Sequence, residues 1–155
     1  MQQTMTRVGL DAHARSTHGA AINVASGELT RARFGAGTEK VVEWLGSLPA
    51  SVHAVYEAGP TGFALARAGR AAGIAVDVVA PGKTARPPAE RVKTDRRDAV
   101  LLARLSLAGQ LSPIAQPSEF IEWARHLMRA REALRGDLLR ARHRVSKLLL
   151  LHGRV

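Results

Sequence analysis

Three short segments near the start of the chain alternate apolar and polar residues, which limits the fold to one that contains a β-sheet. These segments are residues 6–11, 17–24 and 29–34, and alternation with a period of two is typical of strands with one buried face. Gly27 lies in the short turn between the second and third segments and favours a hairpin there. The opening of the chain is therefore predicted to form three strands.

Helical and strand-like segments alternate after this opening. Thr38 can cap a helix that continues to about Leu48, and residues 53–58 are predicted as a fourth strand. A helix over 59–73 and a fifth strand over 74–81 follow. Three strands followed by alternating helices and strands predict an α/β fold, with a mixed five-stranded sheet flanked by helices.

The last part of the chain has a different pattern. A further helix is predicted from about Asp95 to Ala108, and two prolines mark a linker over 111–117. From Ser118 to His152 no proline occurs, and apolar residues recur every seven positions at Leu127, Leu134, Ala141 and Leu148, with Leu138 and Val145 between them. Such a repeat predicts a coiled-coil helix about 50 Å long, with Arg131 at one core position.

The heptad pattern is still running at Val155, so we expect the chain to be a fragment of a longer protein. The predicted organisation is a globular domain over residues 1–110 and the start of a coiled-coil segment over residues 118–155.

Positive charge is concentrated in the second half of the chain. Residues 1–82 hold seven Lys and Arg against six Asp and Glu, whereas residues 83–155 hold sixteen against seven. Only four of the 23 cations are lysine, and the planar guanidinium of arginine suits bidentate contacts with phosphate. A nucleic acid is therefore the predicted partner, and the alternative is a genome that favours arginine codons. The predicted nucleic-acid-binding residues are Lys83, Arg86, Arg91, Lys93, Arg96, Arg97, Arg140, Arg142, Arg144 and Lys147.

Several classes of protein are excluded by what the sequence lacks. The chain has no cysteine, which excludes disulfides and thiolate metal sites. Its first 25 residues contain no long apolar run, and no window approaches the roughly 20 apolar residues of a membrane span. We therefore expect a soluble, cytoplasmic protein with no membrane partner.

Four carboxylates lie at the ends of predicted elements. Asp11 ends the first strand and Glu57 ends the fourth, and ligands in open α/β sheets collect at the carboxyl ends of strands. Asp95 and Asp98 in the motif KTDRRDA are three residues apart, so one face of a helix presents both. Carboxylate oxygens suit Mg²⁺ or Mn²⁺, and two such ions roughly 4 Å apart can stabilise the attacking and leaving oxygens of a phosphoryl displacement.

Each of these carboxylates also has a purely structural interpretation. Asp95 and Asp98 suit the positive end of a helix dipole, Asp11 can cap a turn, and Glu57 can be a satisfied polar residue. Two histidines lie near Asp11 in the sequence, and such residues are more often surface residues than neighbours of a site: His13 and His18.

Three motifs carry a resemblance to a known family. VGLDAH near the N-terminus, YEAGPTG in the middle and KTDRRDA before a helix resemble the N-terminal domain of the bacterial DEDD insertion-sequence transposases, which include the Piv-type invertases. This domain is similar to RuvC resolvase and has an RNase H-like fold. The resemblance covers essentially the whole chain, and none of the four acidic positions is substituted.

The resemblance implies a function and a set of partners. Asp11, Glu57, Asp95 and Asp98 match the catalytic, metal-binding positions of the family, with Mg²⁺ or Mn²⁺ as the cofactor. The implied activity is metal-dependent cleavage and exchange of DNA strands in transposition, directed by a structured bridge RNA in the bacterial cytoplasm at the nucleoid. The C-terminal helix corresponds to the coiled coil through which subunits associate as a homo-oligomer. A C-terminal domain that supplies a serine nucleophile is expected to lie outside this chain.

Two other functions remain open from the sequence. The basic half and the heptads would suffice for a non-catalytic module that binds RNA or DNA and dimerises. A stand-alone RuvC-like junction nuclease would share the acidic site but would need no C-terminal partner domain.

Overall fold

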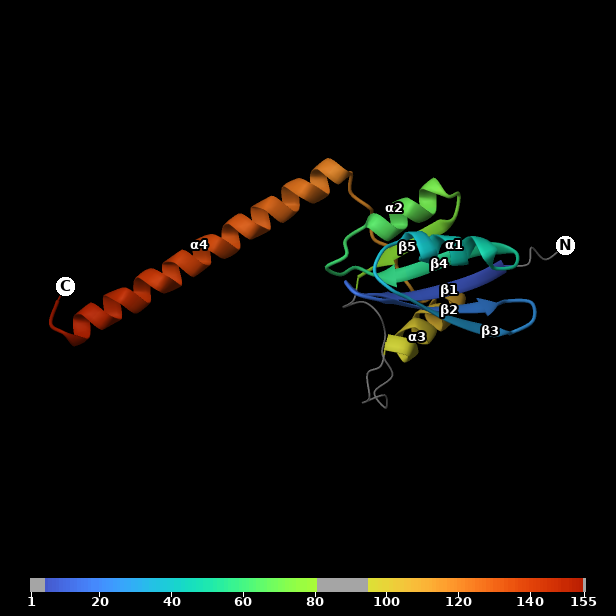
Figure 1. Cartoon of the computed structure of the whole chain (residues 1–155), viewed down its shortest axis with the longest axis horizontal. Coiled ribbons are helices and arrows are strands. Elements are labelled where there is room, and N and C mark those ends of the chain that lie inside the picture. Colours follow the sequence, from blue (N-terminus) through green and yellow to red (C-terminus); the bar gives the residue numbers. More distant parts are fainter. Residues whose placement is uncertain (1–4, 81–94, 155) are drawn as a thin grey trace. The chain divides into compact units, whose positions relative to one another are not determined.

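Five strands form one mixed sheet in the order β3-β2-β1-β4-β5 in the computed structural model, which describes residues 5–80 and 95–154 (Figure 1). β1 pairs antiparallel with β2 and β2 with β3, whereas β4 pairs parallel with β1 and with β5. The strands are β1 (Met5–Ala12), β2 (Thr17–Asn23), β3 (Leu29–Phe34), β4 (Ser51–Glu57) and β5 (Ala75–Val79). The three strands that open the chain therefore form one side of the sheet, as the alternation predicted.

Helices cover both faces of the sheet. α1 (Glu39–Ser47) and α2 (Ala64–Ala71) lie on one face, and α3 (Asp95–Leu107) lies on the other (Figure 1). The alternation of side chains along each strand separates two cores. The larger core, on the α1 and α2 face, includes Val8, Leu10, Val41, Leu45, Ala54 and Tyr56. The core beneath α3 includes Ala20, Val55, Val79, Ala99, Leu102 and Ala103.

The predicted fold class is confirmed. A mixed five-stranded sheet flanked by helices and followed by a long helix agrees with the α/β, RNase H-like (RuvC-like) architecture that the resemblance implied. The hairpin turn was also predicted correctly, because Gly27 has a positive φ of 71°.

Two helix starts differ from the prediction. Thr38 occupies the N-cap of α1, but its side chain makes no capping hydrogen bond, so the helix starts there without the predicted stabilisation. The helix predicted from residue 59 begins only at Ala64, because residues 59–62 form a turn in which the Gly62 N–H donates to the Gly59 carbonyl at 3.0 Å. The backbone of Gly62 has a positive φ of 62°, which is not helical.

Part of the predicted linker packs against the sheet. Pro113 forms a β-bridge with Val79, and the Ile114 N–H donates a hydrogen bond to the Val78 carbonyl at 2.8 Å. The side chain of Ile114 packs against the core beneath α1 and α2, and that of Leu111 packs against the core beneath α3. The prolines suggested an irregular segment correctly, but its apolar residues attach it to the edge strand β5.

The chain divides into two units, Met1–Gln116 and Pro117–Val155. The second unit is α4 (Glu119–Leu151), a helix of 33 residues whose N-cap Ser118 accepts a hydrogen bond from the Ile121 N–H at 3.3 Å. No residue of α4 is buried. Among the described residues no helix is both long and apolar enough to cross a bilayer.

Candidate metal and nucleic-acid site

Asp11 and Glu57 lie next to each other at the ends of two parallel strands. Leu10 of β1 pairs with Tyr56 of β4, so the two carboxylates follow one residue later on neighbouring strands. Side chains alternate between faces, and Leu10 and Tyr56 belong to the core beneath α1 and α2. Asp11 and Glu57 therefore share the opposite face, which α3 covers, and both are half-buried.

The YEAGPTG motif holds Glu57 in place on both sides. The buried hydroxyl of Tyr56 donates a hydrogen bond to the Gly62 carbonyl at 2.9 Å, which ties the turn after β4 to the strand. On the other side of Glu57, the Ala58 N–H donates to the Val79 carbonyl at 2.8 Å. The aromatic residue and the glycines of this motif therefore have structural roles. They fix the backbone around the strand end that carries Glu57.

A histidine contacts the Asp11 carboxylate. His13 Nε2 lies 3.0 Å from Asp11 Oδ2, within a tight turn in which the His13 N–H donates to the Ser16 carbonyl at 2.9 Å. His18 of β2 is the antiparallel register partner of Asp11. The interpretation of both histidines as surface residues is therefore incomplete, because each lies beside Asp11. The two-residue spacing of Asp11 and His13 across a strand end was the available sequence signal.

The first turns of α3 supply the other two aspartates. Asp98 is half-buried and precedes Ala99, which packs under the sheet against the backbone of Gly9 in β1. Asp95 is the first residue of α3, but its side chain lies outside the described residues. α3 packs against β1, β2 and β4, so the aspartates belong to the helix that covers the face bearing Asp11 and Glu57.

The donor chemistry of these residues fits a hard divalent cation. Asp11, Glu57 and Asp98 offer only carboxylate oxygens, which suit Mg²⁺ or Mn²⁺. Among the side chains that the structure describes, no three His, Asp or Glu groups are close enough together to hold a metal ion. The adjacent pair is Asp11 and Glu57, and the set of four stays a prediction.

The predicted nucleic-acid-binding residues fall into three groups. Lys83, Arg86, Arg91, Lys93 and the Arg96 side chain lie outside the described residues. Arg97 is exposed near the start of α3. The remaining four are exposed side chains on α4: Arg140, Arg142, Arg144 and Lys147.

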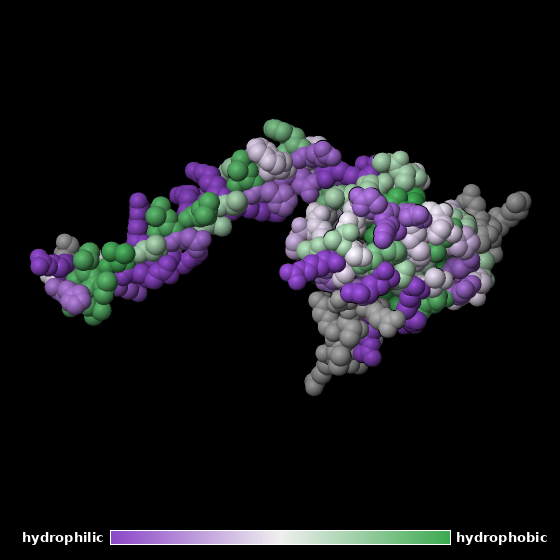
Figure 2. Space-filling model, viewed as in Figure 1, coloured by the Kyte–Doolittle hydropathy of each residue, from purple (hydrophilic) through white to green (hydrophobic). Residues whose placement is uncertain are grey.

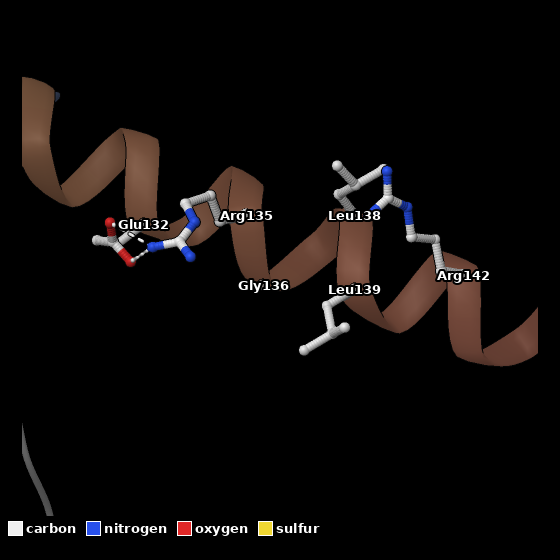
Figure 3. Close-up of a pocket in the computed structure, with 6 residues that line it drawn as sticks. All are labelled: Glu132, Arg135, Gly136, Leu138, Leu139 and Arg142. Carbon is white, nitrogen blue, oxygen red and sulfur yellow. Dashed lines mark hydrogen bonds and ion pairs between the residues drawn. The ribbon is translucent and has the colours of Figure 1, made fainter.

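The cations on α4 differ in their surroundings. Arg140 already forms an ion pair with Asp137. Arg142 borders a shallow hollow that Gly136 leaves in the surface of the helix, together with Arg135 and two leucines (Figure 3). In this hollow Arg135 Nη1 lies 3.2 Å from both carboxylate oxygens of Glu132. The hollow lies on a single helix, and Arg135 and Glu132 within it already form an ion pair with each other.

Apolar residues also gather on α4, where green side chains are prominent in Figure 2. The heptad residues Leu127, Leu134, Leu138, Val145 and Leu148 are each more than half exposed. The continuous helix agrees with the predicted segment, and its apolar seam has no partner within the described residues of this unit.

Comparison with known proteins identifies the family. The model of the IS110-type DEDD transposases, described as transposase, matches residues 8–153. The chain belongs to this transposase family. A transposase-named protein of Sinorhizobium fredii, y4qE, is 42% identical over 120 residues, which are 77% of this chain and 31% of that protein. The transposase for insertion sequence element IS1533 of Leptospira borgpetersenii is 41% identical over 100 residues, 64% of this chain and 29% of that protein.

The resemblance seen in the three motifs is thus confirmed at the level of the family. The chain spans about a third of the length of these relatives. DEDD transposases depend in general on divalent metal ions.

Proposed function

We propose that this transposase chain is the metal-binding catalytic domain that cleaves and exchanges DNA strands in transposition. The observation that supports the proposal most strongly is the register of β1 and β4, since it sets Asp11 beside Glu57 on the face that α3 covers. The KTDRRDA aspartates, Asp95 and Asp98, begin that helix. In the proposal, the carboxylates of these three separate segments meet at the end of the face that α3 covers.

Each of the four residues has a role in the proposal. Asp11, Glu57, Asp95 and Asp98 hold Mg²⁺ or Mn²⁺ through carboxylate oxygens, and the bound ions stabilise charge on the oxygens of the phosphodiester. His13 contacts one oxygen of Asp11 and orients its carboxylate. The hydrogen bonds around Tyr56 and Ala58 fix the strand end that carries Glu57, so the site rests on rigid backbone.

The complete transposase is proposed to contain more than this chain. The matched residues are about 30% of each relative's length, and in the proposal the remainder of such a protein includes a domain with a serine nucleophile. DNA is the proposed substrate, and a structured bridge RNA is the proposed guide. The arginines of the second half of the sequence supply positive charge for either nucleic acid.

Subunit association through α4 is part of the proposal. The heptad seam is continuous over the helix, and its leucines are exposed, so a second copy of the same helix offers a matching apolar surface. Arg144 and Lys147 are three residues apart, and the 3.6-residue period places them on a different face from Leu138 and Val145. The helix can therefore associate through one face and contact phosphates through another.

The metal site is tested by calorimetric titration of Mn²⁺ into the wild-type chain and an Asp98→Ala variant. We expect saturable binding to the wild type and at least tenfold weaker binding to the variant, because one ligand is removed. Arg144→Gln is a matched control on α4 and should bind Mn²⁺ as the wild type does. If wild type and Asp98→Ala bind Mn²⁺ with equal affinity, both with and without added DNA, Asp98 is not a metal ligand.

A second candidate function is a non-catalytic module that binds nucleic acid and dimerises. It is favoured by the absence of a cluster of three ligands among the described side chains. The same titration separates the two functions, because the module would bind DNA without any saturable Mn²⁺ site. A stand-alone junction nuclease would instead bind Mn²⁺ and cleave branched DNA as this chain alone.

A further inference from the structure

A row of polar side chains crosses the sheet at the level of Asp11. Asp11 of β1 pairs with His18 of β2, and His18 pairs with Arg33 of β3. Directly paired residues of antiparallel strands point to the same face, so all three lie on the face that α3 covers. Glu57 continues the row on the other side of Asp11. The row therefore changes from acidic at the centre of the sheet to basic at its β3 edge.

The basic end of the row is hollowed. His18, Gly19, Arg31, Ala32 and Arg33 line a depression of about 280 Å³ on β2 and the edge strand β3. Arg31 and Arg33 are two residues apart on one strand, so they project to the same face about 7 Å apart along it. Residue 31 pairs with Ala20, which is buried under α3. The depression thus borders the region that α3 covers.

Both arginines are available for a ligand. Arg31 and Arg33 are exposed, and neither has an ion-pair partner among the residues that the structure describes. By contrast, three arginines of α4 are paired with acidic neighbours on their own helix: Arg131, Arg135 and Arg140. Two unpaired guanidinium groups on one side of an edge strand form a concentrated positive surface, which suits a chain of phosphates.

We propose that Arg31, Arg33 and His18 bind successive phosphates of the DNA strand that reaches Asp11. This inference rests on the proposed function, because it takes the acidic pair as the destination of that strand. The guanidinium groups hold two phosphates through bidentate hydrogen bonds. His18, between Arg33 and Asp11 in the row, contacts the phosphate nearest to the carboxylates. β3 is then a nucleic-acid surface in the half of the sequence that is almost neutral overall.

The test measures binding of a short, labelled, mixed-sequence single-stranded DNA by fluorescence anisotropy at several salt concentrations, in EDTA. The Arg31→Gln/Arg33→Gln variant is compared with Lys40→Gln/Arg70→Gln, which removes the same charge from exposed positions on α1 and α2, over the other face. Thermal melting establishes that each variant is folded.

We expect the β3 variant to bind at least tenfold more weakly. The slope of log K against log salt should become shallower by about 1.4, because each phosphate that a protein neutralises on a single strand accounts for about 0.7. The control should keep the wild-type slope. Equal weakening in the two double variants would overturn the proposal, and so would a wild-type chain that does not bind this DNA.

The outcome is separable from that of the proposed function. Without metal, the DNA assay reports only on the basic surface, whereas the Mn²⁺ titration reports only on the carboxylates. A β3 variant that binds DNA normally while the wild type binds Mn²⁺ overturns this inference alone. A wild type that shows the β3-dependent slope but binds no Mn²⁺ overturns the metal site and leaves the phosphate-binding surface in place.

Discussion

Gly9 is the residue that allows α3 to lie close to the sheet. A Cβ at this position would collide with the backbone at Ala99 and Ala103 and with the side chain of Leu102. Backbone atoms of a packed helix have little freedom to move aside, so the glycine sets the distance between β1 and α3. Because α3 begins with the aspartates of KTDRRDA, Gly9 also sets how closely the backbone of that helix approaches β1, the strand that carries Asp11.

A Gly9→Ala substitution should therefore destabilise the domain by about 3 kcal/mol or more, at or beyond the upper end of the usual cost of overpacking. Urea unfolding followed by circular dichroism measures the change. Gly46→Ala in α1 is the matched control, since a Cβ there meets nothing within 4 Å. That variant should keep or raise the stability by up to about 1 kcal/mol. Equal stability of the two variants would show that α3 is not held against Gly9.

Helices and strands were predicted correctly where the local pattern of apolar and polar residues determines the structure. The alternation of residues over 6–11, 17–24 and 29–34 placed strands within one or two residues of β1, β2 and β3. The α2 start was missed, because the Tyr56 hydroxyl and Gly62 together hold residues 59–62 in a turn. The strand-like contact of Pro113 with Val79 was missed because it depends on the exposed edge of β5, which the local sequence does not reveal.

The seam of α4 leads to a prediction about association. Leu134 and Leu138 are 68% and 53% exposed, and each would contribute about 1.5–3 kcal/mol if buried against a second helix. Replacing both with glutamine should weaken self-association of the chain by roughly a hundredfold or more. Sedimentation equilibrium measures the dissociation constant. Arg144→Gln/Lys147→Gln, on a different face, should leave it unchanged, and a monomeric wild type would refute the association.

For the molecule as a whole, the sequence singled out the acidic candidates but not the residues around them. Asp11 and Glu57 were singled out because they end predicted strands, and the pairing of β1 with β4 sets them side by side. The contact of His13 with Asp11 and the basic depression at Arg31 and Arg33 were not predicted. The contact of His13 depends on the tight turn that the His13 N–H and the Ser16 carbonyl close. The depression depends on the register of β2 and β3, which relates residues that are distant in sequence and which one sequence alone does not fix.

In the proposed site, carboxylates from β1 and from α3 hold the same metal ions. The most direct test is a double-mutant cycle in which Mn²⁺ affinity is measured by calorimetry for wild type, Asp11→Asn, Asp98→Asn and the double variant. Residues that share a ligand are coupled, so their effects do not add. We predict that each single substitution weakens Mn²⁺ binding at least tenfold and that the double variant binds little more weakly than either. Effects that simply add, or single variants that bind as the wild type does, would contradict a shared site.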